Sequence, residues 1–305
     1  MSQSPVRKRW QEVDGVLLLD KPGGLSSNDA LQKARRLFSA AKAGHTGTLD
    51  PMATGLLPVC FGEATKFSNR LLEADKTYEA VMRLGQTTRT GDAEGEILLE
   101  RPVEVSEQAL QALGLRFWGE QVQMPPMYSA LKHQGRALYE YAREGVEIER
   151  EARRINVIAL DIGVRRDNDV AFTVRCSKGT YVRTLAEDMG EALGCGAHLV
   201  ALRRTAIGDL TVSDAYTLEA LTALEESDRA AMLASPDALL AHLHAIVLDD
   251  QAERKILLGQ PVQAETALSG EVRVYGKSGN FLGLGTADGQ GGIKPLRLLA
   301  SKAVA

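Results

Sequence analysis

Two segments far apart in the chain alternate between apolar and polar side chains, and this period of two constrains the fold more than any other feature. From Thr77 to Leu84 every second residue is apolar or aromatic, and Val170 to Ser177 repeats the pattern. Side chains of a strand point alternately to opposite faces of its sheet. Each segment therefore predicts a strand with one face against a core.

Helical patterns occur between such strands. Gly15 to Leu19 is typical of a buried strand, and turn-forming residues follow it. Ser26 or Ser27 then offers an N-cap for a helix. Apolar residues at helical spacing recur from Leu185 to Leu193, where Gly194 ends the pattern. The chain thus combines strands and helices.

The pattern changes near Gln251, and a length of 305 residues suits one large and one small domain. We predict a first domain at 1–250 and a second at 251–305. Short β-like pieces separated by glycine predict a small β-barrel in the second domain. Within the first, 124–152 is irregular and holds a Pro-Pro pair with aromatic and basic neighbours, which indicates an exposed insertion.

The charge is unevenly distributed. The chain carries a net −4, but residues 214–253 hold nine acids and one base, a net −8, so the remainder is +4. Basic clusters such as Arg203-Arg204 are more often solvated surface than phosphate sites. A polyanionic partner is therefore compatible with the charge but is not established by it.

Cysteine usage and hydropathy indicate a soluble cytoplasmic protein. Cys60, Cys176 and Cys195 form no CxxC pair, which argues against a disulfide framework and a zinc site. The apolar run Val16 to Leu19 is too short for a signal segment or a membrane span.

The stretch GHTGTLDPMATG at 44–55 is predicted to lie in a loop just after a helix, and it holds one carboxylate, Asp50. Its glycines do not form a phosphate-binding P-loop, and His45 has no second histidine at metal spacing. Taken alone, an aspartate before proline is most often a turn former or a helix cap. The alternative is a reactive carboxylate that acts without a metal.

Five collinear motifs decide between these readings. They are DKPGGLSSN at 20–28, GHTGTLDPMATGLLPV at 44–59, DKTYEA at 75–80, KGTYVRTLAEDMG at 178–190 and LRRTAIG at 202–208. Together they resemble the TruB family of tRNA pseudouridine synthases. The resemblance implies an α+β pseudouridine synthase fold, with a large mixed, mainly antiparallel sheet flanked by helices. It also implies a C-terminal PUA-like RNA-binding barrel and a thumb-like RNA-binding role for 124–152.

The resemblance further implies the reaction, which is isomerisation of uridine to pseudouridine at position 55 in the TψC arm of tRNA. The target base is flipped out, an aspartate acts as nucleophile, and no cofactor or metal takes part. The partner is the T arm of tRNA, with no obligatory protein partner, no membrane and a monomeric enzyme. An additional tRNA-folding role stays open, as do attack at C1′, attack at C6 and a glycal route.

The resemblance also implies roles for individual residues. The catalytic residues are Asp50 as nucleophile, Tyr78 stacked on the base and Arg183 as the ion-pair partner of Asp50. The substrate-binding residues are His45, Tyr78, Tyr181, Leu202 and Lys21. The RNA-contacting residues are Tyr128, Lys132, Arg136 and Arg143.

The residues refine one of these roles and leave two other functions open. An ordinary aspartate is already ionised at neutral pH, so Arg183 is expected to orient Asp50 through a bidentate fork and to compensate its burial. One alternative is a non-catalytic RNA-binding module. The other is a glycosidase or phosphotransferase, but a glycosidase of the usual type needs a second, paired carboxylate that no motif supplies.

Overall fold

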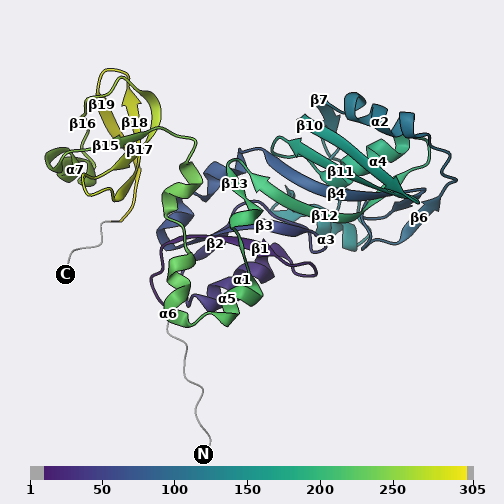
Figure 1. Ribbon diagram of the computed structural model, residues 1–305, viewed down its shortest axis with the longest axis horizontal. Helices are drawn as coiled ribbons and strands as arrows, with labels where there is room; N and C mark the ends of the chain where they lie inside the picture. Colours follow the sequence, from purple (N-terminus) through teal and green to yellow (C-terminus); the bar gives the residue numbers. More distant parts are fainter. Residues whose placement is uncertain (1–9, 301–305) are drawn as a thin grey trace, which may run out of the picture.

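A computed structural model describes residues 10–300, so the ends of both predicted domains, 1–9 and 301–305, lie outside the described range. Within it, a ten-stranded sheet forms the larger part of the molecule and a five-stranded sheet the C-terminal part (Figure 1). The large sheet has the order β14 (Tyr216–Thr217), β1 (Gly15–Lys21), β3 (Thr54–Phe61), β12 (Ala197–Ile207), β4 (Lys76–Leu84), β11 (Asp169–Cys176), β10 (Arg153–Arg166) and β7 (Gly119–Gln123), with β2 (Ala43–His45) beside β3 and β13 (Leu210–Thr211) beside β12.

The large sheet is mixed and mainly antiparallel, which confirms the expected fold class. Its parallel contacts are β1 with β14 and β3 with β12, and the other neighbours are antiparallel. The two alternating segments form β4 and β11, and they pair so that Tyr78 lies opposite Val174. Ala80, Met82 and Leu84 are buried on one face, as the period of two predicts.

Helices cover one face of this sheet. The helix α4 (Val182–Ala192) packs on β12, and α2 (Glu107–Arg116) packs on β10. The other helices are α1 (Ser27–Leu37), α3 (Leu138–Arg143), α5 (Leu218–Ala223), α6 (Glu226–Arg229) and α7 (Asp250–Leu257), with 3₁₀ turns η1 (Gly62–Lys66), η2 (Ser68–Leu72), η3 (Val212–Asp214), η4 (Ala230–Met232) and η5 (Pro236–Leu240). Two hairpins, β5 (Gln86–Thr88) with β6 (Ile97–Glu100) and β8 (Lys132–His133) with β9 (Arg136–Ala137), form separate two-stranded sheets.

Local signals set the helix ends. The Ser26 hydroxyl caps α1 by accepting from the Asp29 amide at 3.1 Å. Beyond α4, Gly194 adopts φ +82°, a conformation that favours glycine after a helix. One local expectation is wrong: the GHTG motif does not lie wholly in a loop, because β2 already includes Gly44 and His45. A strand of three residues is too short to show a period in the sequence.

The C-terminal domain is a curled five-stranded sheet that fits a PUA-like module. Its order is β15 (Ala245–Val247), β17 (Ser269–Tyr275), β18 (Phe281–Asp288), β19 (Gly292–Leu298) and β16 (Val262–Gln263). The predicted short strands are therefore present, and β15 adds a strand from before residue 251. This domain lies at one end of the large sheet (Figure 1).

The two domains share an apolar cluster. The ring of Phe67 lies 5.6 Å from that of Phe281 in an edge contact, and Leu284 is buried with Leu239 and Leu240. The cluster also includes residues of β1 and β3. The small domain therefore packs against the part of the large sheet that contains β3, the strand that follows the Asp50 loop.

Candidate active site

The loop from Thr46 to Ala53, between β2 and β3, carries Asp50. The Ser27 hydroxyl accepts from the Leu49 amide at 2.8 Å and donates to the Leu49 carbonyl at 3.0 Å. The Gly24 amide donates to the Pro51 carbonyl at 2.8 Å. The first two motifs are therefore one structural unit, in which the turn after β1 holds the loop on both sides of Asp50.

Lys21 reinforces the same loop from inside the protein. It has no exposed surface, and its ammonium donates to the carbonyls of Pro22 at 2.9 Å, Leu25 at 2.7 Å and Pro51 at 3.3 Å. Burial lowers the pKa of Lys21 to about 8, and the charge of Asp50 opposes this shift. These contacts support a bracing role, and direct contact with uracil stays a prediction.

Arg183, near the start of α4, forms an ion pair with Asp50, which is far from it in the sequence. Its Nε lies 2.9 Å from the Asp50 carboxylate, and its side chain is 4% exposed. The two Nη atoms donate elsewhere, to the carbonyls of Thr90 at 2.7 Å and Tyr128 at 2.6 Å. The expected bidentate fork is therefore wrong, because the planar guanidinium divides its donors among three acceptors.

Asp92 is a member of the site that sequence reasoning missed. It is buried, and its carboxylate lies 3.6 Å from the same Arg183 Nε. The Thr90 hydroxyl and the Glu94 amide both donate to it, so its turn is fixed internally. Asp50 is thus not a solitary carboxylate. A short turn has no periodicity that would single out Asp92 in a sequence.

Burial and charge act in opposite directions on Asp50. Desolvation raises the pKa of Asp50, the Arg183 guanidinium lowers it, and the nearby Asp92 raises it again. The Asp50 side chain nevertheless keeps 35% of its surface exposed, so a reacting group can reach it. The buried Asp92 has no comparable access, which argues against a pair of carboxylates that both work on a substrate.

Three predicted pocket residues lie on neighbouring elements. Tyr78 is on β4 opposite Arg204 of β12, and burial raises the pKa of its hydroxyl. Leu202 is 8% exposed on β12, opposite Ala80. Tyr181 caps α4, and its amide and carbonyl are both bonded by the Gln123 side chain, at 2.7 and 3.1 Å. Tyr181 therefore adjoins α4, which carries Arg183, and Leu202 lies on β12, the strand on which α4 packs. Contacts of all three residues with a base stay predictions.

His45 enters from the end of β2. Burial lowers the pKa of its imidazole, and the charge of Arg204 adds to this shift. Its Nδ1 is buried without a hydrogen-bond partner among the residues that the structure describes. A neutral ring of this kind suits stacking more than phosphate binding.

The insertion at 124–152 contacts the site through the Tyr128 carbonyl, which accepts a hydrogen bond from Arg183. Of its predicted RNA contacts, Arg136 is already engaged, because it pairs with Glu140 at 3.1 Å and with Glu144. Its guanidinium also lies over a tyrosine ring at 4.6 Å, and that of Arg143 over another at 5.2 Å. Lys132 is exposed.

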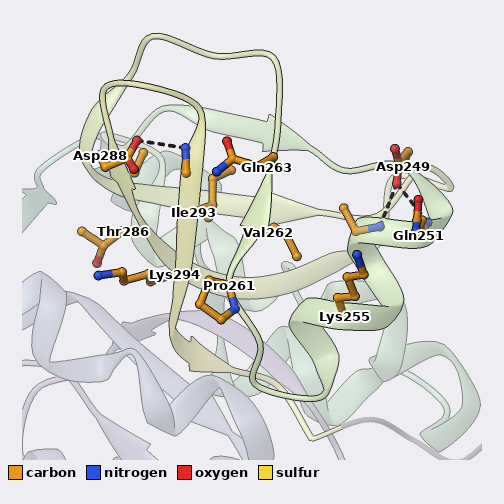
Figure 2. A pocket seen from close by; sticks show the side chains of 13 residues that line it. Asp249, Gln251, Lys255, Pro261, Val262, Gln263, Thr286, Asp288, Ile293 and Lys294 are labelled. Atoms are coloured by element: carbon orange, nitrogen blue, oxygen red, sulfur yellow. Dashed lines mark hydrogen bonds between the residues drawn. The ribbon is translucent and has the colours of Figure 1, made fainter.

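A pocket of about 490 Å³ in the C-terminal domain contains none of these residues (Figure 2). Two of its carboxylates already serve the backbone: Asp249 caps α7, and Asp288 accepts from the Gly292 amide at 2.9 Å (Figure 2). Among residues 10–300, no group of three or more histidine, cysteine or acidic side chains is arranged to hold a metal. No helix in that range is long and apolar enough to cross a membrane.

Three family models define the class of the protein. Residues 35–182 match "TruB family pseudouridylate synthase (N terminal domain)", and 183–248 match "tRNA pseudouridylate synthase B C-terminal domain". Residues 245–299 match "Pseudouridine synthase II TruB, C-terminal". With the fold and the Asp50–Arg183 site, these matches define a pseudouridine synthase, which is an isomerase.

Full-length relatives place the chain more narrowly. It is 58% identical over 299 residues to "tRNA pseudouridine synthase B" of Ralstonia nicotianae, with 95% of each chain covered. It is 56% identical over 304 residues to the protein of the same name from Burkholderia mallei, with 97% of each covered. The chain belongs to the TruB family of pseudouridylate synthases.

Among solved structures, the chain is similar to "Crystal structure of the archaeal box H/ACA sRNP Nop10-Cbf5 complex". The TM-score is 0.70 and the identity 25%, with 94% of this chain and 86% of that chain covered. A second, "Crystal Structure of a Cbf5-Nop10-Gar1 Complex", gives a TM-score of 0.67 at 28% identity, with 91% and 79% covered. Both likenesses extend over the catalytic and the C-terminal domain.

Proposed function

We propose that the protein isomerises one uridine of tRNA, at position 55 in the T arm, to pseudouridine. The observation that carries the proposal is the pair formed by an accessible Asp50 and a buried Arg183, in a chain of this family. The relatives' printed names support tRNA as the substrate. The family motifs around Asp50 support the T-arm position.

Asp50 acts as the nucleophile in this proposal. Burial raises the pKa of Asp50 above its usual value, while the Arg183 charge opposes this shift and its ion pair fixes the carboxylate. Asp50 bonds to C1′ or to C6 of the uridine, or assists elimination to a glycal, and any bond to Asp50 is released again. The N1–C1′ bond breaks, the base rotates, and C5 bonds to C1′. C5 then loses a proton and N1 takes one up, and the neutral Tyr78 hydroxyl is a candidate to relay the C5 proton by giving up its own as it accepts. Substrate and product are isomers, so the balance needs no external reagent.

Access to the uridine requires base flipping. Extruding a base from a structured arm costs a few kcal/mol. Stacking on an aromatic ring returns about 1–3 kcal/mol per base. Tyr78, Tyr181 and His45 supply rings for this purpose, so stacking offsets the extrusion.

Recognition of the arm is assigned to the insertion at 124–152 and to the PUA-like domain. Lys132 and Arg143 are the candidate phosphate contacts, whereas Arg136 would first have to leave its two glutamates. We propose that the enzyme acts as a cytoplasmic monomer on free tRNA. A separate tRNA-folding activity is an additional possibility that the resemblance leaves open.

The variant Asp50→Asn tests the proposal. Asparagine has nearly the size of aspartate and still forms hydrogen bonds, but it lacks the negative charge that makes the carboxylate a nucleophile. We expect no release of tritium from tRNA labelled at uracil C5, with tRNA affinity within about threefold of wild type. Pseudouridine mapping of the treated tRNA identifies the position.

Three results separate the alternatives. Pseudouridine formed by Asp50→Asn at the wild-type rate contradicts the role of Asp50. If the wild-type protein binds tRNA without modifying it, the protein is a non-catalytic RNA-binding module. Refolding of tRNA by Asp50→Asn establishes the folding activity apart from catalysis.

A further inference from the structure

Arg204 is the largest fully buried side chain among the residues that the structure describes, with 1% exposure. Its neighbour Arg203 is 37% exposed and pairs with Asp20 at 2.7 Å. The basic pair Arg203-Arg204 predicts a solvated surface cluster, and for Arg204 this prediction is wrong. Consecutive residues of a strand point to opposite faces, so one arginine reaches the surface and the next enters the protein.

The Arg204 side chain connects both ends of the loop that carries Asp50. Its Nη2 donates to the Gly47 carbonyl at 3.1 Å, and its Nε donates to the Leu56 carbonyl at 2.8 Å. Its backbone lies against Gly55, where a Cβ would come within 2.2 Å of the Arg204 carbonyl oxygen. Glycine at 55 therefore allows β12 to approach, and one guanidinium closes the loop from 47 to 56.

The charge of Arg204 is unusual for a buried group. Within residues 10–300, Arg204 forms no ion pair with a carboxylate, whereas Arg203 does. Its charge instead acts on Tyr78, whose pKa burial raises and Arg204 lowers, and on His45. A buried cation without a carboxylate is costly, and an apolar side chain of similar volume would cost less. A structural role alone does not explain why the charge is there.

We propose that Arg204 is a positioning residue for the isomerisation, which ties down both ends of the Asp50 loop and sets a positive charge beside Tyr78 and His45. The inference rests on the proposed function. Arg183 orients the Asp50 carboxylate from α4, and Arg204 holds the backbone of its loop from β12. The two arginines thus act on the same loop from different elements.

Two variants separate shape from charge. Arg204→Lys keeps the charge, but a single nitrogen cannot reach both carbonyls, and Arg204→Met removes charge and hydrogen bonds together. Arg203→Lys is the matched control, because it changes the adjacent, surface-facing arginine. For each protein we measure the single-turnover rate on tRNA, the tRNA affinity, thermal unfolding, and hydrogen exchange of the amides at 46–53.

We expect faster exchange confined to the loop in both Arg204 variants. The rate falls about 100-fold in Arg204→Met and less in Arg204→Lys, while affinity stays within about threefold, since displacement of a reacting group by about 1 Å has an effect of this size. Arg203→Lys behaves as wild type.

Unchanged loop exchange, or wild-type rates in both variants, would overturn the proposal. So would losses of rate and affinity that only follow a loss of folded protein, because they would leave Arg204 a purely structural role. Wild-type protein that does not modify tRNA would contradict the proposed function instead. The exchange measurement uses no substrate, so it still decides whether Arg204 holds the loop.

Discussion

Replacing Arg183 by lysine keeps the positive charge beside Asp50 but removes the planar arrangement of donors. In the structure these donors serve three acceptors, the Asp50 carboxylate and the carbonyls of Thr90 and Tyr128. A single ammonium cannot point at all three from the position of the guanidinium. At least one carbonyl loses its partner at a site where Arg183 is 4% exposed.

The size of the effect follows from these contacts. A buried polar group without a partner costs about 1–3 kcal/mol, and the ammonium will move to recover the bond. If this amount, about 1–3 kcal/mol, appears as misplacement of Asp50 in the transition state, the rate falls roughly 5- to 150-fold, since 1.36 kcal/mol corresponds to a factor of ten. Ground-state tRNA binding does not use the Asp50–Arg183 pair and should change little.

The assay is a single-turnover measurement of tritium release with enzyme in excess, together with tRNA affinity by filter binding. Arg83→Lys is the control, because Arg83 of β4 makes a true bidentate pair, at 2.7 and 2.8 Å, with Asp169 of the neighbouring strand β11, and both side chains are partly exposed. A surface pair contributes about 0–1 kcal/mol, so this variant should retain its rate. Turnover of Arg183→Lys within about fivefold of wild type would refute the orientation argument.

Two further variants test other parts of the site. Tyr78→Phe keeps the ring but not the hydroxyl, so it should bind tRNA normally and turn over more slowly; an unchanged single-turnover rate would limit Tyr78 to stacking. Glu187→Gln tests a partly buried charge on α4, four residues after Arg183. Desolvation raises the pKa of Glu187 from 4.5 to about 7, so the folded chain holds a proton that the unfolded chain loses in this window. Wild-type stability therefore falls as pH rises from 4.5 to 7. By about pH 8, Glu187→Gln should be more stable than wild type by about 1–3 kcal/mol, with no gain near pH 4. Denaturant unfolding at both pH values measures the difference, and an equal gain at both would contradict the titration.

Some of the fold could be predicted because it is encoded locally. The alternation of β4 and β11 records which side chains face the core, and Ser26 and Gly194 mark helix ends through backbone hydrogen bonding and φ. The Asp50 motif was recognisable for another reason. Its string of glycines, histidine and aspartate is specific enough to resemble one family, although the local chemistry alone favours an ordinary turn.

The contacts among the side chains of the site could not be predicted from local patterns. Asp92 belongs to it because a turn after β5 is bonded internally and lies against α4, and nothing in that short segment marks it. Arg136 has the composition of an RNA contact, but two nearby glutamates engage it. Such pairings depend on where separate elements meet.

The sequence by itself determined the alternating strands and the helix ends, and it singled out Asp50 as the candidate reactive carboxylate. Tertiary structure alone decided what surrounds that carboxylate. Arg203 and Arg204 show why: they are the same residue type at adjacent positions, yet one pairs with Asp20 and the other lies beneath the Asp50 loop. A shift of one residue in strand register would exchange them. Register and strand order arise from the packing of the whole sheet, and no local pattern contains them.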